Sequence, residues 1–352
     1  MQRICCRMDT AVSDTLALAL ATGAVNIPET GNILFLRAAQ IPLLNDLPAD
    51  RTICHNTFKP DYDALEKAGH TLLAPSLTDL PPAALTIILP PRQRDEARAL
   101  YARAIKAAPE GGVIVACLPN TLGGKTAEKT LKELTGNAES LSKHKCRAFW
   151  TRKDSATLNT ALIDNFIALD TPAPVAEGAM VSRPGLFSWN RVDAGSARLI
   201  ETLDIPLKGR GSDLGAGQGY LSKAALQKYP DITHIDLFEA EHRAIACATA
   251  TLDGMGRHDI HWADVLTDLP ENTYDFILTN PPFHTGRADN APLGQSFIRA
   301  AARAIRPGGS VWLVANRHLP YEATLTENFR FHEIVDDAGG YKIIQATKPK
   351  RK

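Results

Sequence analysis

Short apolar runs alternate along the chain with longer amphipathic stretches, a pattern typical of strands followed by helices. In the first half, an apolar run at 85–91 ends in two prolines, and an amphipathic stretch at 94–108 follows it. Gly111 and Gly112 then lead into a second apolar run at 113–118. Strand–helix–strand units of this length form parallel α/β sheets with right-handed crossovers.

The second half repeats this order of elements. A predicted strand at 274–282 again ends in two prolines, a helix is predicted at 296–307, and a glycine pair precedes a predicted strand at 310–316. The tetrapeptide Ala-Arg-Ala-Ile stands at 102–105 and again at 302–305, just before each glycine pair. The repeat predicts two tandem Rossmann-like α/β domains.

Chain length and a proline-rich segment indicate where these domains meet. A chain of 352 residues is longer than most single domains, which contain roughly 100–200 residues. Two prolines lie within 171–176, a composition that stiffens a connection and ends a helix. We therefore predict domains at 1–172 and 173–352; the alternative is a surface loop within one large domain.

Composition and charge narrow the class of protein. Hydrophobic residues make up 44% and charged residues 22%, which excludes disordered, collagen-like and coiled-coil chains. Basic and acidic residues number 39 each, so a polyanionic partner requires a local basic patch. The six cysteines include no C-x-x-C pair, and the polar N-terminus does not resemble a signal peptide. We expect a soluble, cytoplasmic, monomeric protein with reduced thiols, no metal site and no membrane span.

The two halves differ in the polar residues at their strand ends. The second half has a glycine-rich turn at 213–219, whereas nothing equivalent follows the predicted strand at 32–39. Where the second half has Asn280 before its two prolines, the first half has Leu89. We infer one working site, in the C-terminal half.

The glycine-rich turn predicts a ligand site beyond the carboxyl ends of the strands. Its spacing is D-x-G-x-G-x-G, with Asp213, Gly215, Gly217 and Gly219, and differs from the G-x-G-x-x-G of dinucleotide folds. Glycines let the backbone approach a ligand closely. Asp213 suits a cationic amino group and would repel a pyrophosphate.

Two further acids stand at the ends of the next two predicted strands. Glu239 ends the strand at 234–239, where a carboxylate can accept hydrogen bonds from both ribose hydroxyls of an adenosine. Asp264 falls where the following strand would end and can accept a hydrogen bond from the adenine amino group. Each acid alone could be a helix cap. Together with Asp213 and the glycines, they predict S-adenosylmethionine as the ligand.

Asn280, Pro281, Pro282 and Phe283 follow the strand predicted in the middle of the second half. The prolines fix the backbone and remove N–H donors. The Asn280 side-chain oxygen and the Pro281 carbonyl can then accept both protons of an exocyclic amine, which turns its lone pair toward an electrophilic methyl group. Phe283 is expected to stack on the base. The alternative is a proline turn followed by a core Phe.

In these residues the second half resembles class I S-adenosylmethionine-dependent methyltransferases of the N-P-P-[FY] kind, which methylate planar nitrogens. The whole chain is similar to the two-domain ribosomal RNA guanine-(N2)-methyltransferases of the small-subunit methyltransferase C type. The matching segments are Asn-Pro-Pro-Phe-His-Thr-Gly at 280–286, Pro-Gly-Leu-Phe-Ser at 184–188, Asp-Ala-Gly-Ser at 193–196, Asn-Arg-His-Leu-Pro-Tyr at 316–321 and Phe-His-Glu at 331–333.

The resemblance implies methyl transfer to the 2-amino group of a guanine in ribosomal RNA, most simply that of the small (16S) subunit. It also implies that the N-terminal domain is a degenerate methyltransferase copy that aids folding and RNA recognition. The segment 184–196 would form a flap with Phe187 near the cofactor; the alternative is a helix lead-in capped by Asp193.

The first strand of the second half departs from the pattern of the family. Ser212 stands where a large apolar residue is usual, and Ala216 replaces a common Cys. Residues 208–212, Lys-Gly-Arg-Gly-Ser, are poor formers of a central buried strand. We expect that strand to be short or to begin only at Ser212.

A basic run in the first half is the candidate RNA contact. Residues 125–153 contain eight basic and three acidic side chains. Basic patches neutralise phosphates, although a solvated helix face is the commoner meaning of such a run. The candidate RNA-binding residues are Lys143, Lys145, Arg147, Arg152 and Lys153.

Other functions remain open at this point. Large-subunit ribosomal RNA, a protein glutamine or adenine could be the acceptor, since N-P-P-[FY] serves several planar nitrogens. A non-catalytic ribosome-assembly factor is the alternative of another class, and Asn280 argues against it. A nicotinamide dehydrogenase is disfavoured by the glycine spacing.

Overall fold

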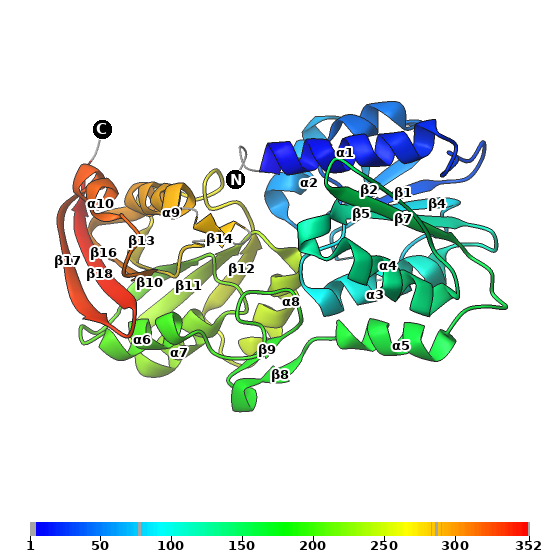
Figure 1. Ribbon diagram of the computed structural model, residues 1–352. Helices are drawn as coiled ribbons and strands as arrows, with labels where there is room; N and C mark the ends of the chain where they lie inside the picture. Colours follow the sequence, from blue (N-terminus) through cyan, green and yellow to red (C-terminus); the bar gives the residue numbers. More distant parts are fainter. Residues whose placement is uncertain (1–4, 77–78, 283, 286–287, 290, 351–352) are drawn as a thin grey trace. The chain divides into compact units, whose positions relative to one another are not determined.

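A computed structural model describes residues 5–76, 79–282, 284–285, 288–289 and 291–350. The chain divides into two compact units, Met1–Thr171 (unit 1) and Pro172–Lys352 (unit 2) (Figure 1). None of the described helices combines the length and the apolar character needed to cross a bilayer.

Unit 1 is built around one seven-stranded sheet with the order β3-β2-β1-β4-β5-β7-β6. All neighbouring strands are parallel except β7, which runs antiparallel to β5 and β6. The strands are β1 Ile33–Leu36, β2 Thr52–His55, β3 Thr71–Leu72, β4 Leu85–Ile88, β5 Val113–Pro119, β6 Glu139–Lys143 and β7 Cys146–Arg152. The helices are α1 Cys5–Ala21, α2 Lys59–Lys67, α3 Arg94–Ala107, α4 Gly124–Thr135 and α5 Thr160–Leu169, with short 3-10 helices at Pro42–Asp46 and Asn120–Leu122.

Unit 2 repeats this architecture with the order β12-β11-β10-β13-β16-β18-β17. Neighbouring strands of this sheet are parallel except at β18, which runs antiparallel to β16 and to β17. The strands are β8 Ala173–Val175, β9 Met180–Ser182, β10 Gly209–Leu214, β11 Ile232–Glu239, β12 His258–Trp262, β13 Tyr274–Thr279, β14 His284–Thr285, β15 Ala288–Asp289, β16 Ile305–Asn316, β17 Phe329–Ala338 and β18 Tyr341–Pro349. The helices are α6 Ala194–Thr202, α7 Tyr220–Lys228, α8 His242–Thr251, α9 Ala291–Ala304 and α10 Glu322–Asn328, with a 3-10 helix at Ala176–Gly178.

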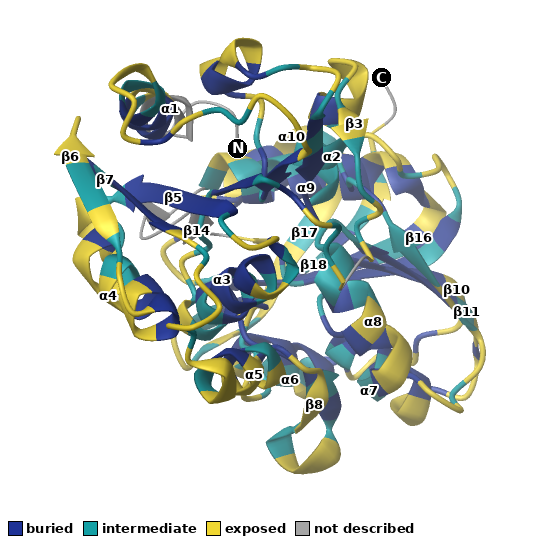
Figure 2. Cartoon of the chain, turned by 90° about the vertical axis from the view of Figure 1, so that its right-hand side faces the viewer, coloured by how far each residue is buried: buried dark blue, intermediate teal, exposed yellow. Residues whose placement is uncertain are grey.

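The identical strand order of the two sheets confirms the prediction of tandem Rossmann-like α/β folds. Helices cover both faces of the unit 2 sheet: Ile298 of α9 and Leu325 of α10 belong to one core cluster, and Leu199 of α6 and Ala248 of α8 to another. The central strands are buried, whereas the outer faces of helices such as α4 are exposed (Figure 2). The strand order reverses between β10 and β13, and ligands of open α/β sheets bind at the carboxyl ends of the strands beside such a reversal.

The prediction that the first strand of unit 2 is short or begins only at Ser212 is wrong. Strand β10 begins at Gly209 and pairs with both β11 and β13. The ring of Phe276 occupies the space that a Cβ on Gly211 would need. Packing against the neighbouring strand therefore selects glycine at this position, and tertiary contacts override its low strand propensity.

The helix predicted over 296–307 is also displaced. Helix α9 spans Ala291–Ala304, and β16 begins at Ile305 rather than at 310. Pro307 cannot continue a helix, and the residue before a proline favours an extended backbone. Ile305 instead pairs with Tyr274, and the register shifts before Ser310 pairs with Phe276.

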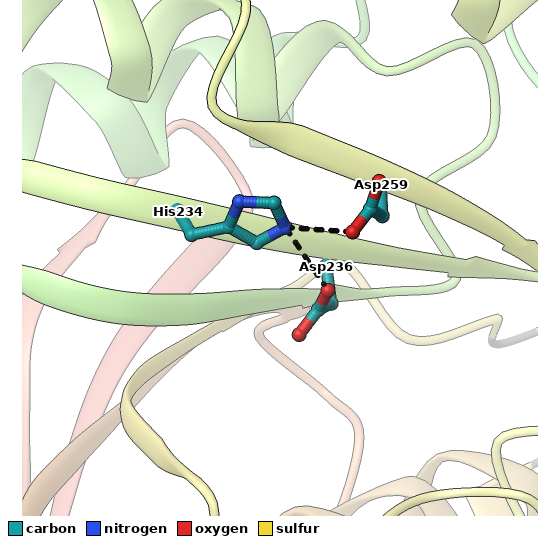
Figure 3. A group of neighbouring side chains, drawn as sticks. All are labelled: His234, Asp236 and Asp259. Carbon is teal, nitrogen blue, oxygen red and sulfur yellow. Dashed lines mark ion pairs between the residues drawn. The ribbon is translucent and has the colours of Figure 1, made fainter.

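A charged group on the sheet links β10, β11 and β12. His234 Nε2 lies 3.3 Å from Asp236 Oδ1 and 3.1 Å from Asp259 Oδ2 (Figure 3). These three side chains have the spacing of metal ligands. The guanidinium of Arg210 donates to the other oxygen of Asp236, Oδ2, over 2.8 Å, so these contacts join the three strands.

Candidate active site

The glycine-rich turn joins the end of β10 to the start of α7. Gly215, Gly217 and Gly219 all have positive φ, and Gly219 precedes the first residue of α7 in the left-handed region. An ideal Cβ on Gly217 would have no heavy atom of the described residues within 4 Å. The turn therefore borders open space, as a ligand cradle requires.

Asp213 lies at the end of β10 and is completely buried. Ser222 of α7 donates to Asp213 Oδ2 over 2.8 Å. Asp213 Oδ1 is buried and has no hydrogen-bond partner among the described residues. Burial raises the pKa of this carboxyl to about 7. An acceptor oxygen without a partner at this edge fits the cationic group for which the sequence predicted Asp213.

Glu239 ends the neighbouring strand β11 and is bonded to the glycine turn. Its Oε2 accepts from Gly217 N over 2.8 Å, and its Oε1 accepts from Glu241 N over 2.7 Å. Burial raises the pKa of Glu239. A carboxylate has about four lone-pair sites, so two backbone contacts leave capacity for hydroxyl donors.

Asp264 follows β12, the next strand outward. Its Oδ1 accepts from Leu266 N over 2.9 Å, and its own N–H donates to Asp268 Oδ2 over 2.7 Å. Because β10, β11 and β12 are adjacent and parallel, their terminal acids line one edge of the sheet in order.

Asn280 follows β13, on the other side of β10. Thr279 Oγ1 donates to the Leu214 carbonyl over 2.8 Å and so joins the end of β13 to the glycine turn. Asn280 Nδ2 donates to Asp193 Oδ2 and to Ser196 Oγ, each over 2.9 Å. Both amide protons are therefore used, and the side-chain oxygen remains as the acceptor.

Pro281 is buried and Pro282 is exposed. Phe283, which the sequence predicted to stack on the substrate base, lies outside the described residues.

The cap expected at Asp193 is present, whereas the flap expected for segment 184–196 stays a prediction. Asp193 is the N-cap of α6 and accepts from Ser196 N over 2.8 Å. The Phe187 residue is 55% exposed. The Phe187 carbonyl accepts from Gln218 Nε2 over 2.7 Å, which ties the segment to the glycine turn.

Sequence reasoning missed Gln218 and the contacts of Asn280 with Asp193 and Ser196. Gln218 stands between Gly217 and Gly219 in the glycine turn and also donates to Ser182 Oγ over 3.0 Å. Its position inside the motif was the available signal. The contact from Asp193 to Asn280 crosses 87 residues of chain and had no local signal.

The candidate RNA-binding residues lie in and next to the β6–β7 hairpin of unit 1 and fall into two groups. Lys143 and Lys145 are exposed near its tip. The other three side chains are engaged within the unit: Arg147 pairs with Glu128, Arg152 Nη1 donates to the Gly111 carbonyl over 2.8 Å, and Lys153 Nζ donates to the Ala108 carbonyl over 2.6 Å.

The corresponding edge of the unit 1 sheet is built differently. Arg37 follows β1, where unit 2 has its glycine turn. Its guanidinium pairs with Glu96 of α3 and donates to Thr57 Oγ1, beyond β2, over 2.8 Å. In unit 1 an ion pair and a hydrogen bond of Arg37 therefore lie where unit 2 has its glycine turn.

Residues 177–345 match the family model described as the methyltransferase small domain. A ribosomal RNA small subunit methyltransferase C from Shigella flexneri serotype 5b is 30% identical over 257 residues, which are 73% of this chain and 73% of the relative. The protein of that name from Erwinia tasmaniensis is 30% identical over 259 residues, 73% of this chain and 74% of the relative.

A solved structure has the same fold over almost the whole chain. It is the T. thermophilus 16S rRNA N2 guanine methyltransferase RsmC in complex with AdoMet and guanosine. The TM-score is 0.78 at 23% identity, and the match covers 96% of this chain and 91% of that chain. The resemblance predicted from the sequence is confirmed by the curated relatives, and this chain belongs to the ribosomal RNA small subunit methyltransferase C family.

Proposed function

We propose that this chain transfers a methyl group from S-adenosylmethionine to the exocyclic 2-amino group of a guanine in small-subunit ribosomal RNA. The observation that carries the proposal is the corner after β13, where both Asn280 amide protons are used and its oxygen is left to accept. The names of the curated relatives support this acceptor class.

Residues of four neighbouring segments would hold S-adenosylmethionine. Asp213 would meet the amino group, Glu239 the ribose hydroxyls and Asp264 the adenine, with the turn of Gly215, Gly217 and Gly219 beneath them and Phe187 alongside. The buried Asp213 Oδ1, which has no partner among the described residues, supports this fit. When bound, S-adenosylmethionine supplies an electrophilic methyl group on a sulfonium.

Asn280 and Pro281 would orient the acceptor amine. The Asn280 oxygen and the Pro281 carbonyl would each accept a hydrogen bond from the amino group, which reduces the conjugation of its lone pair with the ring and directs that lone pair at the methyl group. Proline has no N–H to compete for these acceptors. The two residues act by position and by their dipoles. The methylated amine is a strong acid and would lose its extra proton to solvent, so no strong general base is required.

The two units would have different roles. Unit 2 would carry catalysis, and unit 1 would serve folding and RNA recognition. The ion pair of Arg37 with Glu96 lies where unit 2 has its glycine turn and supports a degenerate unit 1. Lys143 and Lys145, exposed near one hairpin tip, are the strongest RNA-contact candidates.

We further propose that the enzyme is cytoplasmic, acts as a monomer and needs no metal.

The decisive experiment measures transfer of labelled methyl from S-adenosylmethionine to unmodified small and large ribosomal subunits and to their naked RNAs, with Asn280→Ala as the control. We expect 2-methylguanine in small-subunit RNA with the unaltered chain and none with the variant. Label only in large-subunit RNA would keep the chemistry and change the substrate. Cofactor binding without label in either RNA would contradict the proposal and favour a protein glutamine acceptor or a non-catalytic role.

A parallel reaction with a chelator tests the independence from metal, and light scattering at the assay concentration tests the monomer. Loss of activity with the chelator, or a dimer mass, would overturn these parts of the proposal separately.

A further inference from the structure

We infer that Asp193 and Ser196 are positioning residues that fix the side-chain amide of Asn280 with its oxygen toward the acceptor amine. This inference rests on the proposed function, because it assigns the device that orients a residue of that same site. Neither residue would touch the acceptor or the methyl donor; both would act through Asn280.

The chemistry of the partners determines which way the amide points. A carboxylate is a hydrogen-bond acceptor only, so the end of the Asn280 side chain that faces Asp193 Oδ2 must be the NH₂ group. The distance between these atoms is 2.9 Å. In the inverted amide, the carbonyl oxygen would face a carboxylate oxygen, and two acceptors would repel each other. The assignment therefore follows from the donor and acceptor types.

Ser196 completes the arrangement. Its hydroxyl oxygen lies 2.9 Å from Asn280 Nδ2 and accepts the second amide proton. The Ser196 residue is 8% exposed, so water competes little for this contact. Rotation of the amide by half a turn would replace the hydrogen bond to Asp193 with a repulsive contact between two acceptors, whereas the Ser196 hydroxyl could donate to the inverted amide oxygen.

Asp193 is itself held in place by helix α6. One oxygen, Oδ2, accepts both the Ser196 backbone N–H over 2.8 Å and the Asn280 amide. Gly195 lies between them, and a Cβ there would stand 3.0 Å from the Tyr341 ring and 3.1 Å from Asp193 Oδ2. The segment Asp-Ala-Gly-Ser therefore combines a helix cap, a close packing contact and two acceptors for one amide.

Ordinary helix caps in this chain provide a matched comparison. Asn159 caps α5 by accepting from Leu162 N over 3.1 Å, and it lies in unit 1, in the N-terminal half of the chain. If Asp193 were only a cap, replacing it would have the consequences of replacing Asn159: lower stability and no specific effect on the reaction.

The test compares three substitutions at two residues, Asp193 and Ser196. Asp193→Ser keeps a good N-cap residue, but its shorter side chain cannot also reach Asn280. Asp193→Asn keeps an oxygen of the same reach, and Ser196→Ala removes only the second acceptor. We expect Asp193→Ser to lower kcat by roughly 10-fold to 100-fold, since misplacement of an orienting group has effects of this size. The KM for S-adenosylmethionine should change by less than about twofold, because neither Asp193 nor Ser196 would contact the methyl donor.

Asp193→Asn should keep most of the activity that Asp193→Ser loses. The kcat of Ser196→Ala should lie between those of Asp193→Asn and Asp193→Ser. Asn159→Ala should lower the melting temperature without changing kcat of the folded fraction. If the activity that Asp193→Ser loses is fully explained by the fraction of this variant that is unfolded, Asp193 acts only as a helix cap and the inference is overturned.

A second measurement does not depend on activity. Selective ¹⁵N labelling of asparagine side chains reports each NH₂ group by NMR, and Asn280→Asp identifies the Asn280 signal by its loss. We expect slow solvent exchange of this NH₂ group in the unaltered chain and fast exchange in Asp193→Ser. Equal exchange in both would overturn the inference even if the proposed function holds. Protected exchange in a chain that methylates no ribosomal RNA would keep the inference about Asn280 and reject the proposed function.

Discussion

Phe276 on β13 lies directly beside Gly211 on β10, and its ring fills the space where a side chain of Gly211 would begin. Gly211 is buried in the centre of the unit 2 sheet, and Phe276 is 2% exposed. The two residues lie in the strand that carries Asp213 and in its neighbour.

Gly211→Ala should destabilise unit 2, because the new methyl group overlaps the Phe276 ring. Overpacking of a core costs about 1–3 kcal/mol, and for a unit of this size we expect a decrease in melting temperature of roughly 2–4 °C per kcal/mol. Thermal unfolding followed by circular dichroism measures the change.

The double variant Gly211→Ala with Phe276→Leu provides the control. Its free energy of unfolding should fall by less than the sum of the two single changes, since the smaller side chain makes room for the methyl group. Strictly additive effects would contradict a direct overlap of the two residues.

The pair also shows where sequence reasoning stops. Hydrophobic runs and their spacing predicted both sheets, because buried parallel strands leave a strong local pattern. They failed at Gly211 because its low strand propensity is local, whereas the ring that requires it belongs to a distant segment.

The same distinction holds for the site. Asp213, Glu239, Asp264 and Asn280 could be predicted to lie on one edge, since the carboxyl ends of parallel strands meet there. The cap at Asp193 was available as an alternative from its local pattern. The hydrogen bond from Asn280 to Asp193 depends on how α6 packs, which no residue spacing encodes.

Cofactor affinity should depend on pH through Asp213. Burial raises the pKa of this carboxyl from its ordinary value to about 7, and a bound cation favours its charged form. Below pH 7 binding must therefore release a proton. We expect the Kd for S-adenosylmethionine to rise toward about tenfold per pH unit as the pH falls from 7 to 5.5. Calorimetry in two buffers with different ionisation enthalpies measures the released proton.

Two variants test this assignment. Asp213→Asn should bind S-adenosylmethionine weakly and with a flat pH profile over the same range. Ser222→Ala removes a hydrogen bond that lowers the Asp213 pKa, so the pH profile of its cofactor affinity should move to higher pH.

The free protein should also lose stability from Asp213 as the pH rises from about 4 to 7, because the folded pKa lies above the unfolded one. Unchanged affinity across this range would show that Asp213 does not meet the cation.

Asp236→Asn should destabilise unit 2 and change its acid sensitivity. Asp236 is 1% exposed and Arg210 contacts it with two nitrogens. Burial raises the pKa of Asp236, but the hydrogen bonds and charge of Arg210 outweigh it and hold the pKa below its ordinary value. The stability from this group is therefore present above about pH 4 and is lost as the pH falls through the folded pKa.

We expect Asp236→Asn to cost about 1–3 kcal/mol in urea unfolding at pH 7, at the lower end of buried pairs because the Arg210 side chain is half exposed. The difference from the unaltered chain should shrink below about pH 4. Asp259→Asn is the matched control, since its 64% exposed side chain should contribute little. Equal losses in the two variants would refute the role of the buried Asp236.

Lys143 and Lys145 should contribute to RNA affinity through phosphate contacts. The residues between Lys143 and Cys146, His144 and Lys145, both have positive φ, the backbone of a tight two-residue hairpin turn. This turn holds two exposed ammonium groups near one tip. Each phosphate contact adds about 0.7 to the slope of log Kobs against log salt for single-stranded nucleic acid. The double variant Lys143→Ala with Lys145→Ala should therefore lower that slope by up to about 1.4, measured by titrating small-subunit RNA at several salt concentrations.

The double variant Lys67→Ala with Lys208→Ala is the control, because it removes the same charge from two other exposed positions. If both variants lower the slope equally, general charge rather than the hairpin carries the RNA affinity.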